Sequence, residues 1–459
     1  MPGSRIYDVV VVGPDVGGAA AAALCARRGL RTVLAPMTKV ATARESDGWL
    51  LPAAHPMIVP LRQLSAAMPS LDELGLGADL LRQAAATQGG FQILGDKLRL
   101  SLPAEPSKRK VELSRELAPA QAEQAERDFE ALEDLGKPWD AFLTDPPPWP
   151  PRGFFEKRRV RKFVPPSPAL PEGLIGECLR ALAPFAATLV GDSAPEATAR
   201  EASALLRSPL RLWGGTGQLH ELLRERLTAG GGEVAPDQTT QVRFERKGAV
   251  LQMDGAEVRA ACVVFACGAE DIARLLEGGG KVEAKLGEEA ALPAARKVSL
   301  AHFVVRGEAL PLPLEEAALL LGQEGGPLVI SALPARKARG EAKGEKVLTV
   351  ARVNEVEFED GAGFLKSVRA ALDPVLPYFE RHILHELADV SPAAGHRILR
   401  PHEDADPIGL RPATDAHDRV MFASAATYPG FGLEGQLLAA RAAADQALAL
   451  SGKKKISAT

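Results

Sequence analysis

The stretch Tyr7-Asp8-Val9-Val10-Val11-Val12-Gly13-Pro14-Asp15-Val16-Gly17-Gly18 decides the fold of this chain. Its first half is a continuous β-branched run, which is typical of a strand buried on both faces of a parallel sheet. Its second half is a glycine-rich turn, after which an alanine-rich helix is expected from residue 19 to 28, closed by Gly29. Residues 30 to 34 indicate a second strand. Strand, turn, helix and strand within about thirty residues predict a βαβ dinucleotide-binding unit.

Two later blocks of sequence fit the same kind of domain. The middle block begins with Trp-Gly-Gly-Thr-Gly-Gln-Leu at 213–219 and ends with a buried strand at 262–268, with two further strands expected at 241–245 and 249–253. The last block has a short strand at 419–423. It continues through Thr-Tyr-Pro-Gly-Phe-Gly-Leu-Glu-Gly at 427–435 into a helix.

Composition limits the class of protein. The 459 residues suit two or three packed domains, and 46% hydrophobic with 25% charged residues is ordinary globular composition. The 55 basic and 59 acidic side chains leave a net charge of −4, which argues against a nucleic-acid-binding protein. Four cysteines are too few for a disulfide scaffold. With no secretory leader pattern and no run of eighteen apolar residues, we expect a cytoplasmic protein, at most peripheral at the inner membrane face.

The three blocks together resemble the FAD-dependent phytoene desaturase and flavin amine oxidase superfamily, over about residues 7 to 450. The resemblance implies an α/β fold in which a FAD/NAD(P)-binding Rossmann-like domain with a discontinuous parallel sheet carries an inserted α+β substrate domain. It places the dinucleotide-binding domain at 1–75, 205–289 and 396–450, the substrate or partner domain at 76–204 and 290–395, and a flexible tail at 451–459.

The residues that contact FAD in such proteins differ here. The second glycine of the fingerprint, which lets the backbone approach the pyrophosphate, is Asp15. A carboxylate about 4–5 Å from a phosphate costs roughly 3–4 kcal/mol per like-charge pair at an effective dielectric of about 20. The ribose-binding Glu expected after the second strand is Ala35, and the Gly-Asp pair before the last motif is Ser424-Ala425. The glycines expected within 37–43 are absent.

The glycines that shape the turns remain, at Gly13, Gly18, Gly430, Gly432 and Gly435. We therefore expect a degenerate FAD cleft, no catalytic residue, and a cofactor-free pseudo-oxidoreductase that binds a protein or an apolar ligand. The Rab GDP-dissociation inhibitors, which keep a related fold without using flavin and bind a prenylated protein, are the precedent. The alternative is a desaturase-like, FAD-dependent oxidoreductase acting on an isoprenoid or another apolar substrate.

A second candidate surface follows a proline-rich stretch at 145–151. It consists of Phe154, Phe155, Lys157, Arg158, Arg159, Arg161, Lys162 and Phe163. Basic side chains interleaved with aromatic rings suit an anionic membrane surface or a protein partner. A solvated basic linker is an equal alternative, and nucleic-acid binding is a weaker one.

The remaining candidates are few. His382 and His385 lie three apart on a helix expected at 376–387, a spacing that can bind a metal but is more typical of a solvated helix face. No metal site is predicted. Within the substrate domain, strands are expected at 298–305, 327–333 and 346–353, and a helix at 364–372.

Overall fold

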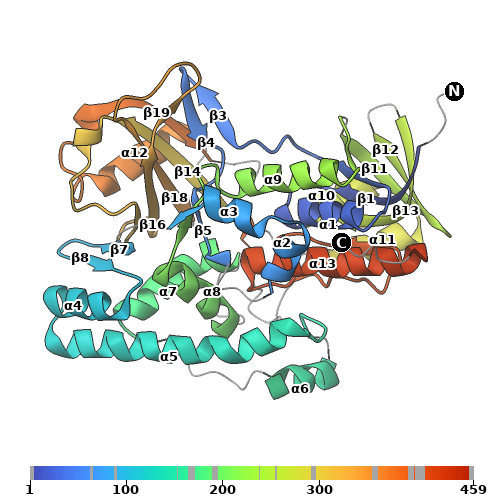
Figure 1. The fold of residues 1–459 in the computed structure, drawn as a ribbon, viewed down its shortest axis with the longest axis horizontal. Helices are drawn as coiled ribbons and strands as arrows, with labels where there is room; N and C mark the ends of the chain where they lie inside the picture. The colour runs from blue at the N-terminus through green and yellow to red at the C-terminus, as the bar shows by residue number, and fades with distance from the viewer. Residues whose placement is uncertain are drawn as a thin grey trace.

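Two large sheets organise the chain, and helices pack around both (Figure 1). The computed structural model describes residues 5–61, 66–86, 90–151, 153–163, 171–188, 195–236, 238–253, 256–290, 296–353, 360–390, 397–398 and 409–453.

The first sheet is assembled from the start, middle and end of the chain. Its strands are β1 (Arg5–Val12), β2 (Thr32–Ala35), β10 (Glu233–Val234), β11 (Thr239–Glu245), β12 (Gly248–Met253), β13 (Ala256–Phe265) and β21 (Val420–Phe422). They lie in the order β10-β2-β1-β13-β12-β11, and β21 pairs with the end of β13. All pairs are parallel except those of the β11–β12 hairpin and β12 with β13. The mostly parallel sheet explains why β1 is a valine run.

Helices cover both faces of this sheet. They are α1 (Val16–Arg27), α9 (Gly215–Ala229), α10 (Ala269–Leu276), α11 (Lys281–Ala290) and α13 (Gly432–Ser451). Val9 and Val11 share a core with the alanines of α1, whereas Val10 and Val12 pack in a second core with residues of α10 and α11. Because alanine is small, α1 can pack closely against both α9 and α13.

The second sheet joins an early segment of the chain to a late one. Its strands are β7 (Phe91–Leu94), β8 (Arg99–Leu102), β14 (Arg296–Val305), β15 (Ala317–Leu320), β16 (Leu328–Pro334), β18 (Lys346–Val353), β19 (Ile383–Asp389) and β20 (Arg397–Ile398). Their order is β19-β14-β18-β16-β15-β7-β8, with β20 beside β14. Helix α12 (Gly361–Leu372) covers one face. The other face shares its core with residues of the first sheet and of α1, α9 and α13.

A helical layer lies beside the two sheets, along the lower side of Figure 1. Its helices are α4 (Pro106–Glu116), α5 (Pro119–Thr144), α6 (Gly153–Phe163), α7 (Leu174–Ala187) and α8 (Pro195–Arg207). Shorter elements are α2 (Met68–Glu73), α3 (Gly77–Gln83), β3 (Ala43–Ser46), β4 (Trp49–Pro52), β5 (Met57–Ile58), β6 (Ala85–Ala86), β9 (Leu210–Arg211), β17 (Arg336–Lys337), and 3-10 turns at Gly307–Ala309 and Phe379–His382.

The helix expected at 376–387 is wrong. His382 ends a 3-10 turn and His385 lies in strand β19, which pairs with β14. The segment is rich in helix formers, but pairing with β14 satisfies its backbone hydrogen-bonding groups, and tertiary context overrides propensity at such positions. The two histidines have separate acidic neighbours: His382 lies 3.5 Å from Glu308 and His385 lies 3.3 Å from Asp47.

The strands and helix predicted for 290–395 are confirmed as β14, β16, β18 and α12. All four cysteines are buried and unbridged. The domain boundaries stay a prediction. Of the tail predicted at 451–459, Ser451 ends α13 and Lys453 pairs with Asp8 at 2.7 Å, while 454–459 lie outside the described residues. Of the helices in the described ranges, none has the length and apolarity needed to cross a bilayer.

Candidate functional site

The glycine turn lies between β1 and α1, at the carboxyl ends of the parallel strands. Gly13 has φ +129°, and a Cβ there would lie 2.1 Å from the carbonyl oxygen of Ala266. A Cβ on Gly18 would lie 2.3 Å from Cβ of the same alanine. Ala266 directly follows β13, so these two glycines are required by the packing of the turn against the neighbouring strand.

Asp15 turns its carboxylate toward the last block of sequence. Its Oδ2 accepts a 2.9 Å hydrogen bond from the backbone N–H of Ala425, 410 residues away in the chain. Asp15 is also the N-cap residue of α1, and its own carbonyl accepts from Gly18 and Ala19. A negative charge beside a helix N-terminus is favourable, because the helix dipole places partial positive charge there.

The first turn of α1 has a second internal partner. The N–H of Gly17 donates to Oε1 of Gln436 at 3.2 Å, and both residues are buried. N–H groups at a helix N-terminus are the usual binding site for a phosphate. In this chain, one of these N–H groups, that of Gly17, is already hydrogen-bonded to the side-chain amide of Gln436 in α13.

The end of β2 carries no charge. Ala35 is fully buried, and its carbonyl accepts the N–H of Gly13 at 3.1 Å. Pro36 follows, and Met37 is also buried. Pro14 and Tyr428 are buried as well.

The last block folds into a turn closed by its own side chains. Oγ of Ser424 accepts from the N–H of Ala426 at 3.2 Å, and the N–H of Ser424 donates to Oγ1 of Thr427 at 3.1 Å. Gly430 and Gly432 have φ values of +91° and +45°. A Cβ on Gly432 would lie 1.9 Å from the carbonyl oxygen of Ala186 in α7.

Gly435 is also needed for packing. A Cβ there would lie 2.8 Å from the carbonyl oxygen of Tyr428. Gly13, Gly18, Gly432 and Gly435 therefore have a packing reason in this chain, whether or not a ligand binds.

A small cavity lies where α7, α9 and α13 approach β5 and β16. Its volume is about 40 Å³, and it is lined by His55, Met57, Ile58, Val59, Phe185, Ala186, Thr188, Leu205, Thr216, Val329, Leu433 and Gln436. The lining is mostly apolar, and the first turns of both α9 and α13 reach it. Such a volume holds about one water molecule, whereas pockets for small organic ligands measure about 300–1,000 Å³.

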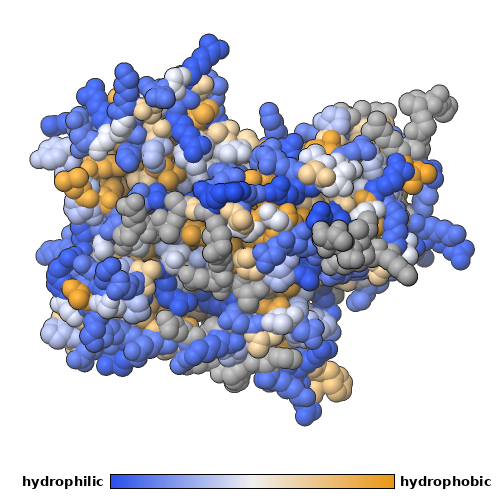
Figure 2. All heavy atoms as spheres, in the orientation of Figure 1, coloured by the Kyte–Doolittle hydropathy of each residue, from blue (hydrophilic) through white to orange (hydrophobic). Residues whose placement is uncertain are grey.

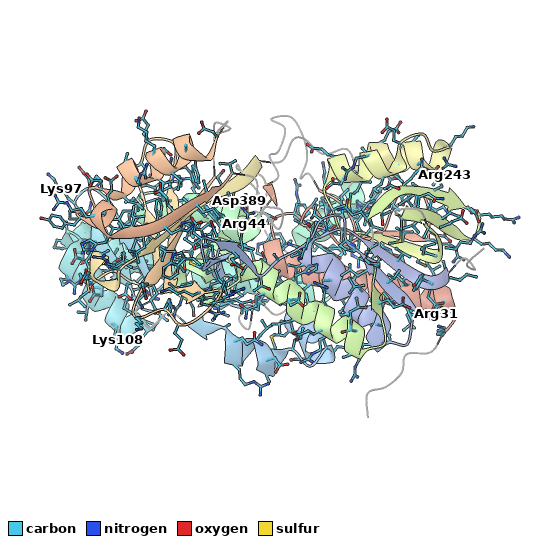
Figure 3. The ribbon with its side chains drawn as sticks, turned by 90° about the horizontal axis from the view of Figure 1, so that it is seen from above. Arg31, Arg44, Lys97, Lys108, Arg243 and Asp389 are labelled. Atoms are coloured by element: carbon cyan, nitrogen blue, oxygen red, sulfur yellow. The ribbon has the colours of Figure 1, made fainter. Side chains whose placement is uncertain are left out.

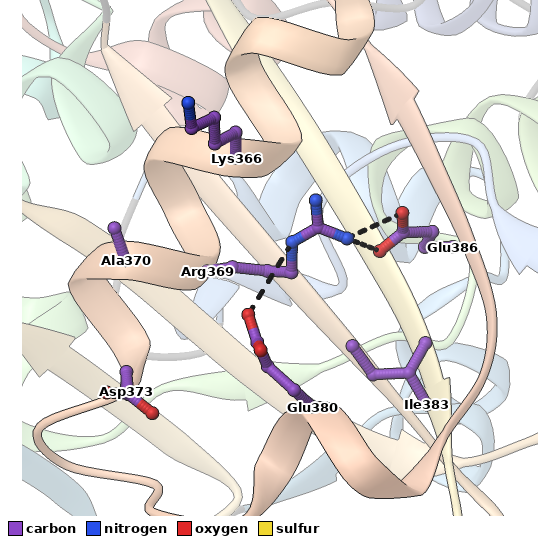
Figure 4. Close-up of a pocket in the computed structure, with 7 residues that line it drawn as sticks. All are labelled: Lys366, Arg369, Ala370, Asp373, Glu380, Ile383 and Glu386. Carbon is purple, nitrogen blue, oxygen red and sulfur yellow. Dashed lines mark hydrogen bonds and ion pairs between the residues drawn. The ribbon is translucent and has the colours of Figure 1, made fainter.

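A larger, open groove of about 590 Å³ lies between α12 and β19 (Figure 4). Arg369 extends from α12, and its Nη1 lies 2.8 Å from each carboxylate oxygen of Glu386. Its Nε lies 3.8 Å from Glu380. The guanidinium is thus already paired within the groove, which limits what it could offer to a ligand.

A buried ionic cluster connects the helical layer to α13. Arg200 lies 2.5 Å from Glu434, 2.6 Å from Glu201 and 2.6 Å from Asp140. The N–H of Ala66 donates to the other oxygen of Glu434 at 2.7 Å. Burial raises the pKa of Glu201 well above its ordinary value; Arg200 opposes this shift and Glu434 adds to it.

The structure brings Asp15 of the predicted dinucleotide cleft into contact with Ala425, whereas the predicted basic segment forms a separate helix. Phe154 to Lys162 lie on α6, at the lower edge of the molecule in Figure 1. The side chain of Phe163 lies outside the described residues. Sequence reasoning missed Gln436 and the cluster around Arg200. Glu434 stands inside the last motif, but no local pattern indicates that Arg200 would reach it.

The fold is that of the amine oxidases, and the predicted resemblance is confirmed at this level. Cyclohexylamine oxidase from Brevibacterium oxydans has a TM-score of 0.62 at 14% identity, covering 97% of this chain and 99% of that one. Putrescine oxidase bound to putrescine has a TM-score of 0.61 at 16% identity, covering 96% and 99%. An oxidoreductase from Methanosarcina mazei has a TM-score of 0.58 at 13% identity, covering 95% and 99%. No protein-family model matches the chain, and no curated protein matches it by sequence.

Proposed function

We propose that this chain is a cofactor-free pseudo-oxidoreductase, a binding protein built on the amine oxidase fold. One observation carries the proposal: the carboxylate of Asp15 lies at the N-terminus of α1 and accepts the N–H of Ala425. Because this kind of domain holds a pyrophosphate at the N-terminus of the same helix, a carboxylate there supports the proposal.

The residues present do not fit FAD in that position. A bound pyrophosphate would meet the Asp15 carboxylate, at roughly 3–4 kcal/mol per like-charge pair. It would also displace the hydrogen bond to Ala425, which, made to a charged group, is worth about 1.5–3 kcal/mol. Ala35 offers the ribose no carboxylate. We therefore assign no catalytic step to this cleft.

The volume of the small cavity beside α9 and α13 helps to distinguish an apolar ligand from a protein partner. At about 40 Å³ it is far smaller than an isoprenoid or a flavin ring requires. An apolar ligand would need the two domains to separate around it, whereas a protein partner on the surface would not. The geometry therefore favours a protein partner over an apolar small molecule as the bound species.

The second candidate is a FAD-dependent, desaturase-like oxidoreductase acting on an isoprenoid or another apolar substrate. Two observations favour it. The similar structures include a putrescine oxidase and a cyclohexylamine oxidase, and the glycine turns are kept. The packing contacts of Gly13, Gly18 and Gly432 account for the second observation without a cofactor.

The test restores the missing contacts. The triple variant Asp15→Gly, Ala35→Glu, Ala425→Asp should bind FAD at least about 100-fold more tightly than wild type, because about 3 kcal/mol of repulsion is removed. Affinity is measured by quenching of flavin fluorescence during titration with protein.

A single substitution guards against a triple variant that does not fold. Asp15→Asn keeps a hydrogen-bond acceptor and removes the charge, so it should also increase FAD affinity. The same change at exposed Asp418 is the matched control and should have no effect. Equal affinities of wild type and the Asp15 variants would contradict the proposal, and so would tight binding by wild type.

A further inference from the structure

Helix α6 is fixed to the body of the protein by one side only. Val160 is buried, and Glu156 forms an ion pair with Arg411. The same arginine donates from Nε and Nη2 to the carbonyl of Pro150, at 3.1 and 3.0 Å. Just before the helix, Trp149 is buried and donates to the carbonyl of Pro429 at 3.0 Å. The proline stretch therefore holds α6 in one place.

The opposite side of α6 faces solvent. Phe154 and Phe155 are 71% and 83% exposed, with their rings 5.8 Å apart, edge to face. Residues three and four positions apart share a helix face, so Arg158, Arg159 and Lys162 continue this face beyond the two rings. All three are exposed. Figure 2 shows hydrophilic and hydrophobic residues side by side at the lower right edge, where α6 lies.

The charge of this face is uncompensated. Arg158, Arg159, Arg161 and Lys162 form no ion pair within the part of the chain that the structure describes. Glu156 is the helix's one acidic residue, and it points inward to Arg411. Four cations and two aromatic rings thus face outward from a chain whose net charge is −4.

We propose that this outward face of α6 docks on an anionic lipid bilayer. The two phenylalanine rings enter at the level of the headgroups, while the cations beside them contact lipid phosphates and carboxylates. The role is independent of whether the dinucleotide cleft binds FAD, so either proposal can fail without the other.

Two features favour a bilayer over other anionic partners. Exposed apolar rings gain from entering a lipid interface, whereas a purely electrostatic contact with nucleic acid would leave them in water. The acidic chain as a whole also repels an extended polyanion, but a single protruding helix can reach a flat surface alone.

The experiment measures co-sedimentation of the full chain with vesicles. Wild type should sediment with phosphatidylcholine vesicles that contain phosphatidylserine, at low salt, and remain in solution with phosphatidylcholine alone. Physiological salt should weaken binding, because the Debye length falls to about 8 Å. The variant Arg158→Glu, Arg159→Glu, Lys162→Glu should bind at least about 100-fold more weakly.

Two matched control variants make the same kinds of substitution, charge reversal and apolar to serine, at exposed positions outside α6. Arg243→Glu, Arg246→Glu, Lys247→Glu reverses three exposed cations at the β11–β12 hairpin, which carries the labelled Arg243 in Figure 3, and should leave binding unchanged. Phe154→Ser with Phe155→Ser should weaken binding. Val111→Ser with Leu312→Ser, which removes two other exposed apolar side chains, should not.

Three outcomes would overturn the proposal. Wild type could stay in the supernatant with anionic vesicles at low salt. The hairpin variant could lose as much binding as the α6 variant. Finally, α6-dependent binding to an oligonucleotide, with no binding to vesicles, would reassign the surface to nucleic acid.

Discussion

Carboxylates stand at the N-termini of both long helices that meet at the dinucleotide cleft. Asp15 is the N-cap residue of α1, although its side chain makes no capping hydrogen bond, and Glu434 lies in the first turn of α13. Each accepts a backbone N–H from a distant segment, from Ala425 and Ala66 respectively. Both carboxylates thus lie near the positive end of a helix dipole, which is a favourable place for negative charge.

Glu201 should make the stability of the protein fall as pH rises. Its pKa in the folded state is raised, chiefly by burial, above the ordinary value of 4.5. Between these two values the unfolded chain loses the proton and the folded chain keeps it, so the free energy of unfolding decreases with pH. The Glu201→Gln variant cannot titrate. Its stability relative to wild type should increase by up to about 1.4 kcal/mol per pH unit within that window.

Urea unfolding of both proteins across about pH 5 to 8 measures this difference. Replacing exposed Glu130 by Gln is the control and should give a difference that does not vary with pH. The contrary result is a Glu201→Gln variant that becomes less stable relative to wild type as pH rises. It would show that the ionised carboxylate stabilises the cluster around Arg200.

Packing between elements constrains the glycines of α1. Gly18 faces Ala266, so Gly18→Ala places a Cβ only 2.3 Å from another Cβ and should destabilise the protein by about 1–3 kcal/mol. A Cβ on Gly287 in α11 would meet no other described segment within 4 Å, so Gly287→Ala should stabilise the protein by about 0.5–1 kcal/mol. Chemical denaturation measures both.

Opposite signs for these two substitutions are the expected result. Similar effects of both would mean that α1 can move away from β13 without cost. In that case the turn would be adjustable, and the retained glycines would again suggest selection for a ligand.

At the level of elements, sequence periodicity predicted most of what positions the site. The valine run, the glycine turn and the strands of the two later blocks are where they were expected, because each carries a strong local signal. Strand β19 was missed since its leucines, glutamate and alanine favour a helix, and only pairing with β14 makes it a strand. The proline-rich stretch at 145–151 gave no indication that Trp149 would be buried against Trp139 and Phe142 of α5.

The site itself was predictable only in part. That a carboxylate replaces the second fingerprint glycine is evident from the sequence. The hydrogen bond between the Asp15 carboxylate and Ala425 joins two residues that are 410 positions apart in the chain. The hydrogen bond between Gln436 and Gly17 joins two residues that are 419 positions apart. No local pattern encodes such pairs. The same holds for Arg44 and Asp389, an ion pair of 2.6 Å between β3 and β19 (Figure 3).

At the scale of the whole molecule, long-range contacts join the helical layer to the start of α13. Trp139, Phe142 and Trp149 form an aromatic cluster with Phe431, the N-cap residue of α13, with ring centroids 5.1–6.1 Å apart. Together with the ionic cluster at Arg200, they hold the first turn of α13 from the side opposite the sheet. This bracing is independent of any cofactor, which is consistent with a scaffold kept for binding.

The flavin content of the purified protein tests the central claim most directly. The full chain, expressed with flavin available and never exposed to denaturant, is assayed for visible flavin absorbance, and any bound nucleotide is released by heat and quantified against protein. Our account predicts a colourless protein that releases no FAD. A yellow protein that releases FAD in a one-to-one ratio would contradict it, and would place the chain with the working oxidoreductases whose fold it shares.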